Sequence, residues 1–161
     1  MLGWYLHDAM IHYTTPHGLE QYSGAAMGLR DVCQGPTELL VATGNLGPLR
    51  DLLRIVYEHQ DRQTGDWPQW FMFDRFREVR AAESHADIIH WPIKALCDYV
   101  EATGDLSILD EQVAYTDDRT KAVTAETESV FAHTERQIAR IERDCIPVSY
   151  THLTLPTNRE V

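Results

Sequence analysis

The sequence predicts an all-α fold, and three observations support this class. Apolar residues recur at the three- and four-residue spacing of an amphipathic helix in several segments. The same Ala-Thr-Gly sequence stands at 42–44 and at 102–104, as is typical of a helix that stops at a left-handed glycine. No segment shows the clear apolar–polar alternation of a half-buried strand. We therefore expect about five helices arranged as helical hairpins.

The first three helices are expected before residue 61. Apolar residues at helical spacing predict a helix over 2–13, which Pro16 and Gly18 would end. A second helix is expected after Pro36, running to Gly44. A third is predicted over 49–60, with one apolar face made of Leu49, Leu52, Leu53, Val56 and Tyr57.

Two more helices are expected in the second half. Residues 61–76 form a loop rich in aromatic residues, and a fourth helix is predicted from about 86 to 102. The last helix is predicted from about 125 to 143, with an apolar stripe made of Val130, Phe131, Thr134, Ile138 and Ile141. The glycines Gly44 and Gly104 are predicted C-caps, and Asn45 or Asp105 can cap the segment that follows each.

Composition limits the class of protein. The chain has 161 residues, 43% of them hydrophobic and 24% charged, as in a soluble single domain. A net charge of -11 argues against nucleic acid and anionic membranes as partners. The sequence offers neither an apolar run of about 20 residues nor a signal-peptide pattern, so a cytoplasmic location is expected. Three separated cysteines, Cys33, Cys97 and Cys145, are expected to be free, buried thiols.

The last residues, 148–161, differ from the rest of the chain. They read VSYTHLTLPTNREV, which neither extends the last helix nor begins another. This stretch resembles a translated vector or adapter tail, and we expect it to be non-native and disordered.

The stretch QYSGAAMGLRDVCQG leads through small residues to Arg30 and Asp31. A guanidinium beside a carboxylate can recognise a sugar, because it offers planar donors next to an acceptor for vicinal hydroxyls. The small residues would let a ligand approach the backbone. An exposed charge pair at a helix start explains the same residues and contributes little to stability.

The aromatic loop also allows two interpretations. Trp67, Trp70, Phe71 and Phe73 lie within seven residues, and Trp91 follows. Indole faces stack on the apolar faces of pyranose rings, so the loop is a candidate sugar-binding wall. It is equally a loop held in the core by its aromatic side chains.

The segment ESHADIIHWP offers candidate metal ligands in Glu83, His85, Asp87 and His90. His85 and His90 are five residues apart and so do not share a helix face, which favours a polar pocket wall over a metal site. The candidates for acid–base chemistry are Asp31, Asp66, Asp74, Glu83 and Asp87.

Three long motifs resemble one family. The segments from Trp4 to Leu40, GDWPQWFMFD and ESHADIIHWPIKALCDYVEATGD are similar to the catalytic domain of glycoside hydrolase family 94, the cellobiose-phosphorylase-like enzymes formerly called glycosyltransferase family 36. The resemblance covers about residues 2–147. It implies that 1–147 is a fragment of an (α/α)6 barrel, with about five of its helices.

The resemblance also implies a reaction. Members cleave a β-glucoside with inorganic phosphate and invert the anomeric centre to give a sugar 1-phosphate, with no further cofactor. By this likeness Arg30 and Asp31, with Gln34 nearby, would bind the sugar on the non-reducing side of the cleaved bond. Trp67, Trp70, His85 and Asp87 would belong to the walls of the active site.

The chain departs from the family pattern. The general acid is expected in a Gly-Asp-Trp-Asn-Asp segment downstream of Pro147, where the unusual tail begins. Met27, Leu29 and Ala86 also differ from the residues expected there. We therefore expect a metal-free fragment of an oligosaccharide or disaccharide phosphorylase with no catalytic residue of its own. The sequence does not decide whether the parent enzyme is a homodimer. A hydrolase on the same barrel and a non-catalytic helical binding module are the alternatives.

Overall fold

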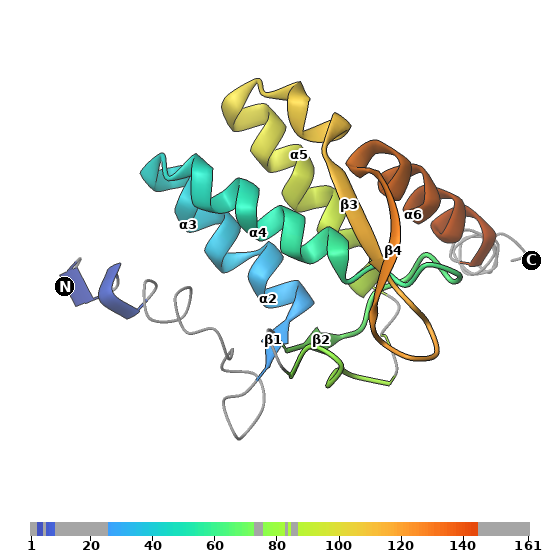
Figure 1. Ribbon diagram of the computed structural model, residues 1–161. Helices are drawn as coiled ribbons and strands as arrows, with labels where there is room; N and C mark the ends of the chain where they lie inside the picture. Colours follow the sequence, from blue (N-terminus) through green and yellow to red (C-terminus); the bar gives the residue numbers. More distant parts are fainter. Residues whose placement is uncertain are drawn as a thin grey trace, which may run out of the picture.

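A computed structural model describes residues 3–4, 6–8, 26–72, 76–82, 84 and 87–144, and the fold is given for these. Most of them are helical. Figure 1 shows the longer helices α3, α4 and α5 lying side by side, with α6 beyond a β-hairpin. The helices are α2 (Leu29–Cys33), α3 (Gly35–Thr43), α4 (Leu46–Glu58), α5 (Trp91–Thr103) and α6 (Val130–Asp144), with short 3-10 helices η2 (Ile88–His90) and η3 (Leu106–Asp110).

Several predicted helices and both predicted glycine helix ends are confirmed. The described residues 3–4 and 6–8 are helical, and the rest of the expected helix 2–13 lies outside the described residues. α3 ends at Gly44 (φ 70°) and α5 at Gly104 (φ 67°), both in the left-handed conformation predicted for them. The side chain of Asp105 accepts from the Ser107 N–H. Asn45 is the N-cap residue of α4, but its side chain donates to the Thr43 hydroxyl and makes no capping hydrogen bond.

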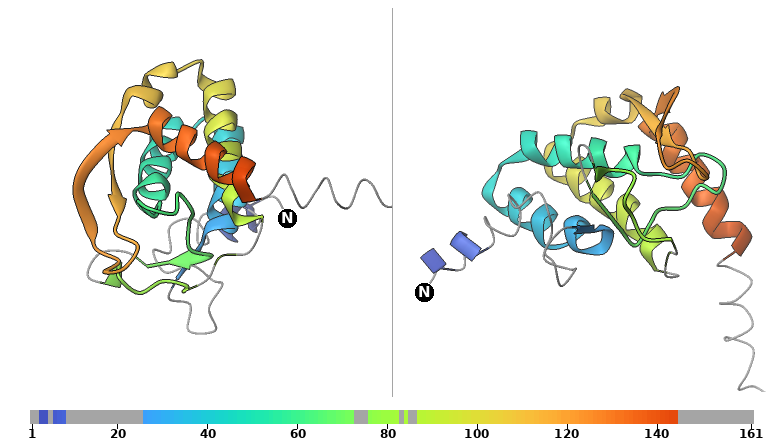
Figure 2. Two further views of the ribbon diagram at one scale, coloured as in Figure 1. Left: turned by 90° about the vertical axis from the view of Figure 1, so that its right-hand side faces the viewer. Right: turned by 60° about the horizontal axis from the view of Figure 1, so that its bottom comes forward.

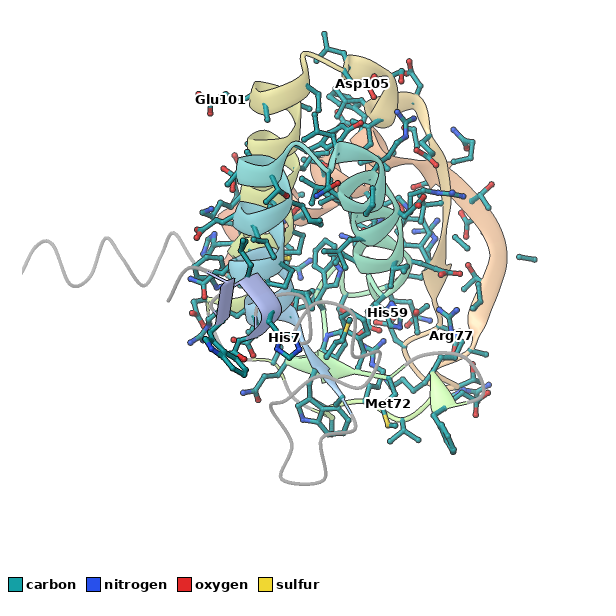
Figure 3. All side chains as sticks on the ribbon, turned by 90° about the vertical axis from the view of Figure 1, so that its left-hand side faces the viewer. His7, His59, Met72, Arg77, Glu101 and Asp105 are labelled. Carbon is teal, nitrogen blue, oxygen red and sulfur yellow. The ribbon has the colours of Figure 1, made fainter. Side chains whose placement is uncertain are left out.

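α4 buries the face that its sequence predicts. Leu49, Leu53, Val56 and Tyr57 are at most 1% exposed, and α3 and α5 pack beside the helix. Arg50 extends from this helix to η3, where its Nη1 lies 2.5 Å from Asp105 Oδ2. Figure 3 shows Asp105 at one end of the molecule, opposite the end that carries His59 and Arg77.

The expectation of a purely all-α chain is wrong. Two small antiparallel sheets are present, β1 (Met27–Gly28) with β2 (Trp70–Phe71), and β3 (Gln112–Thr116) with β4 (Val123–Ser129). The start of the predicted helix 125–143 belongs to β4. Val113 and Tyr115, two residues apart, are buried on β3. This alternation is typical of a strand, but it is short and lies between segments with helical spacing, so the sequence analysis did not identify it. Figure 2 shows the β3–β4 hairpin arching beside the helices.

The buried face of α6 also differs from the predicted stripe. Val130, His133 and Gln137 are at most 1% exposed, whereas Phe131 is 52% and Ile138 41% exposed. The helix therefore turns two polar side chains towards the core and leaves part of its apolar stripe uncovered.

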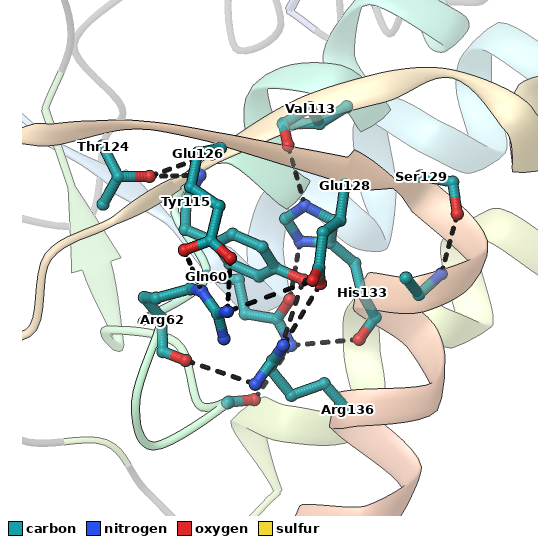
Figure 4. Close-up of polar contacts among 12 residues, drawn as sticks. Gln60, Arg62, Val113, Tyr115, Thr124, Glu126, Glu128, Ser129, His133 and Arg136 are labelled. Atoms are coloured by element: carbon teal, nitrogen blue, oxygen red, sulfur yellow. Dashed lines mark hydrogen bonds and ion pairs between the residues drawn. The ribbon is translucent and has the colours of Figure 1, made fainter.

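Groups from distant segments hydrogen-bond to His133 on this face (Figure 4), whereas the buried Oε1 of Gln137 has no partner among the described residues. Nδ1 of His133 lies 2.7 Å from Gln60 Oε1, and Nε2 lies 3.1 Å from the Val113 carbonyl. Gln60 Nε2 donates to the Gly65 and His133 carbonyls at 3.0 and 3.1 Å. Burial lowers the pKa of His133 to about 4, so the ring is neutral at pH 7 and can donate to only one of its two acceptors.

The described thiols differ in exposure. Cys33 is buried, as expected, and burial raises its pKa. Cys97 is free but exposed, so the expectation that it is buried is wrong, and Cys145 lies outside the described residues.

The described elements form helical layers with a flanking hairpin and do not close into a barrel. Among these helices, none is both long and apolar enough to cross a membrane.

Candidate functional site

A short strand pair places the start of α2 beside the aromatic loop. Gly28 pairs with Trp70, and the Leu29 N–H donates to the Gln69 carbonyl at 2.9 Å. Gly28 has extended geometry (φ -68°, ψ 127°) as the N-cap residue, so the chain turns directly from strand into helix. Arg30 and Asp31 therefore stand in the first turn of α2, next to the backbone of Trp70.

The first candidate cluster joins α2 to the start of α5. Arg30 Nη2 donates to Asp87 Oδ1 at 2.7 Å, and Trp91 Nε1 lies 3.4 Å from Asp87 Oδ2. Burial favours a higher pKa for Asp87, but the Trp91 hydrogen bond and the Arg30 charge outweigh it and hold that pKa below its usual range. Asp87 is thus an acceptor that stays ionised at neutral pH.

The cluster keeps unused hydrogen-bonding capacity. Among the described residues, the buried Arg30 Nε has no acceptor, and the half-buried side chains of Asp31 and Gln34 make no hydrogen bond. Gln34 is the C-cap residue that follows α2, so it lies just outside the helix that carries Arg30 and Asp31. A half-buried carboxylate and a half-buried amide therefore accompany the Arg30–Asp87 ion pair, a set suited to a polyhydroxylated ligand.

The two tryptophans of the aromatic loop have different environments. Trp67 is 1% exposed, its Nε1 donates to the Val56 carbonyl at 2.8 Å, and its ring meets Tyr57 edge-on at 5.9 Å. The interpretation as a loop held in the core is therefore correct for Trp67, whose faces are covered by protein. Trp70 is half-buried on β2.

Some candidate residues lie elsewhere. His85, Glu83, Asp74 and Phe73 lie outside the described residues. No group of three or more possible metal ligands occurs in the part of the chain that is described. Asp66 lies within the aromatic loop, where its Oδ1 accepts from the Trp67 N–H at 2.8 Å and its Oδ2 lies 3.8 Å from Arg140 of α6.

Trp91 is a contributor that the site prediction left out. Its indole donates to Asp87 from the first position of α5, just before Pro92. The sequence HWP predicts a helix start at this point, because proline is favoured in the first turn of a helix, but it does not predict the bond to Asp87.

Comparison with known proteins matches most of the chain to part of a curated enzyme. No family model matches the chain. The chain is 52% identical over 123 residues, 76% of its length, to a 1,2-beta-oligoglucan phosphorylase of Listeria innocua serovar 6a. The matched region covers 11% of that relative, so the chain corresponds to a small part of a much longer protein.

Proposed function

We propose that this chain is part of an inverting carbohydrate phosphorylase of glycoside hydrolase family 94, acting on β-1,2-linked glucose oligomers. The observation that carries the proposal is the 52% identity to a 1,2-beta-oligoglucan phosphorylase over 123 residues. The motifs around Arg30 and Asp87 agree with it. In this proposal residues 1–147 belong to an (α/α)6 catalytic barrel of a cytoplasmic enzyme, and 148–161 are a non-native tail.

The proposed role of the described residues is to bind and orient one sugar. Asp31 accepts hydrogen bonds from vicinal hydroxyls, and Gln34 can donate and accept beside it. The 2.7 Å ion pair holds Arg30 and Asp87 in place before the substrate arrives, which lowers the cost of ordering them on binding. Trp70 and His85 complete the proposed wall, while buried Trp67 supports it from behind.

The proposed reaction needs one carboxylic acid and inorganic phosphate. A phosphate oxygen forms a bond to the anomeric carbon while the bond from that carbon to the leaving sugar oxygen breaks. The acid gives its proton to the leaving oxygen, and the anomeric configuration inverts. The acid belongs downstream of Pro147, so we expect the 161-residue chain alone to form no sugar 1-phosphate.

A chimera tests the proposal. Residues 26–144 replace the matching segment of the Listeria relative, and sugar 1-phosphate is measured with a β-1,2-linked glucose trimer and inorganic phosphate. We expect an active chimera, in which Asp31→Asn lowers kcat/KM by about 10- to 100-fold, because a hydrogen bond to a charged group is lost.

The matched control is Asp51→Asn on the exposed face of α4, whose side chain is 75% exposed; it should leave kcat/KM unchanged. Equal activity of Asp31→Asn and the unmodified chimera would refute the binding role of Asp31. Release of glucose without phosphate would favour the hydrolase alternative.

A further inference from the structure

An apolar groove lies between α5, η3 and the first turns of α6 (Figure 1). It has a volume of about 450 Å³, and its apolar walls are Ile93, Leu96, Cys97, Val100, Leu109 and Phe131. The hydroxyl of Thr134, which also lines the groove, already donates to the Val130 carbonyl at 2.9 Å. None of the described residues that line this α5–α6 groove belongs to the Arg30 cluster, so the groove is separate from the proposed sugar site.

The apolar surface continues along α6. Phe131 is 52% and Ile138 41% exposed, and Ile141 is half-buried. Spacings of three and four residues place Phe131, Thr134, Ile138 and Ile141 along one side of the helix. The apolar stripe predicted for α6 is therefore present, but beyond Val130 it extends from the groove along the outside of the helix. Adjoining exposed apolar side chains of this kind are typical of an interaction surface.

Carboxylates stand beside this apolar surface. Glu101 lines the groove from α5, and Figure 3 shows its side chain pointing outward. Glu135 and Glu142 are exposed, and each follows an exposed apolar residue of the stripe by four residues. The ion pairs that α5 and α6 make within the described chain use other residues, and Lys94, the basic residue of α5, is paired with Asp98 at 2.6 Å. A surface that is apolar in the middle and basic at its edges would be complementary.

An amphipathic helix has the shape that such a groove accepts. It places side chains three, four and seven residues apart along one apolar face, which a groove between two helices can bury. The match to the Listeria relative covers only 11% of that protein, so most of a protein of that length lies outside the matched region. A segment of the same polypeptide also avoids the cost of bringing two molecules together.

A second copy of this chain fits the groove less well. In a two-fold interface the same face meets itself. Such an interface would bring Glu135 and Glu142 towards the same carboxylates of the other copy, and like charges repel. The net charge of -11 on each copy adds to this repulsion.

We propose that the α5–α6 groove is the docking surface for an amphipathic helix of the parent enzyme, from outside residues 1–161, with basic residues beside its apolar face. The inference rests on the proposed function only in that the chain is part of a longer enzyme, and it needs neither sugar binding nor phosphorolysis. Cys97 lies in the groove wall and is exposed, so the docked helix covers its thiol.

The Cys97 thiol makes docking measurable. The 161-residue chain and the chimera that carries residues 26–144 are treated with N-ethylmaleimide, and modification of Cys97 is followed by peptide mass spectrometry. We expect modification at least about tenfold slower in the chimera, because the thiol reacts only when the helix leaves the groove. In urea that unfolds both proteins the two rates should be equal. Equal rates in the folded proteins would overturn the proposal.

A point variant gives the same measurement without exchanging a segment. The Listeria relative with a cysteine at the position aligned with Cys97 should also be modified at least about tenfold more slowly than the 161-residue chain. Modification of that cysteine as fast as in the 161-residue chain would overturn the proposal, whether or not the chimera folds.

The apolar wall is tested by Phe131→Ser. In the chimera it should speed Cys97 modification at least about fivefold, because the docked helix loses an apolar contact. In the 161-residue chain, which lacks the docked helix, it should leave the rate unchanged. Val123→Ser is the matched control, since Val123 is 39% exposed on β4, and it should change neither rate. An unchanged rate for Phe131→Ser in the chimera would count against docking in this groove.

The charge of the partner is tested by Glu135→Lys. In the chimera it should speed Cys97 modification, because it places a cation beside the basic edge of the docked helix. Glu78→Lys, at an exposed carboxylate that does not line the groove, should leave the rate unchanged. Slower modification in Glu135→Lys would contradict a basic partner.

This proposal and the proposed function fail separately. An active chimera in which Cys97 reacts as fast as in the 161-residue chain would overturn only the docking surface. An inactive chimera with a protected Cys97 would contradict only the phosphorylase assignment. Protection of Cys97 in the 161-residue chain that disappears on dilution would assign the groove to a second copy and overturn the proposal.

Discussion

α4 and α6 are both amphipathic helices, but they bury opposite kinds of side chain. α4 turns a continuous apolar face to the core, with Leu53 at 1% and Val56 at 0% exposure. α6 buries His133 and Gln137 and leaves Phe131 half exposed. The stripe of α4 identifies its core face, whereas the stripe predicted for α6 is correct for Val130 but wrong for Phe131 and Ile138. Amphipathic periodicity thus locates a helix but does not always say which face is covered.

The difference has a physical cause in the partners of each face. Apolar side chains gain from any apolar neighbour, so the core face of α4 needs no specific partner. A buried polar group costs free energy unless it is hydrogen-bonded. Gln137 Nε2 donates to the carbonyl of Ile89, 48 residues away in the sequence, whereas its buried Oε1 has no partner among the described residues.

The largest expected effect is on α4. Leu53→Ala removes a buried side chain from the middle of the core, and we expect the free energy of unfolding to fall by about 3 kcal/mol, the sum of lost burial and a cavity. Urea unfolding followed by circular dichroism measures it. A loss below about 1 kcal/mol would show that α3 and α5 collapse onto the gap.

Acidification should weaken the fold next most strongly. Burial lowers the pKa of His59 and of His133 to about 4 from an ordinary value of 6.5. Between these values the unfolded chain binds more protons than the folded chain, so stability falls as pH decreases. From pH 7 to 5 we expect a loss of about 2 kcal/mol for each histidine.

The His133→Gln variant separates the contribution of His133 from that of His59. It keeps a polar side chain on α6 but cannot titrate, so the pH-dependent loss in urea unfolding should be about half. Stability that stays flat or rises towards pH 5 would contradict the prediction. It would show instead that the folded ring is charged and donates to both Gln60 and the Val113 carbonyl.

The smallest effect is expected on the outer face of α6. Ile138 is 41% exposed, so Ile138→Ser should change the free energy of unfolding by less than about 0.5 kcal/mol. Thermal unfolding of this variant beside Leu53→Ala makes the comparison. A cost similar to that of Leu53→Ala would mean that another surface covers Ile138 in solution, as the binding-module alternative requires.

Local sequence was sufficient for much of the helical layer. The ends of α3 and α5 followed from Gly44 and Gly104, and the buried face of α4 followed from its spacing. The β3–β4 hairpin was missed because its alternation is short and lies between helical patterns. The burial of His133 could not be predicted, because its partners Gln60 and Val113 lie 73 and 20 residues away.

The candidate site was predicted in its residue types but not in its arrangement. Arg30 and Asp87 were both selected from their motifs, yet their ion pair spans 57 residues and no local spacing indicates it. The burial of Arg80 was not predicted, because an arginine in a charged loop is usually exposed. Its burial depends on a strand bridge to Phe71 and on Asp61, which only the folded chain brings together.

The polar face of α6 also constrains the order in which the fold can be completed. On a ribosome, Gln60 emerges long before His133, and until then its buried amide lacks both the His133 carbonyl and the His133 ring. The early-made helices can form and associate, because α4 has its apolar partners at hand. The last step, in which α6 docks on Gln60, therefore waits for the end of the described chain to be synthesised.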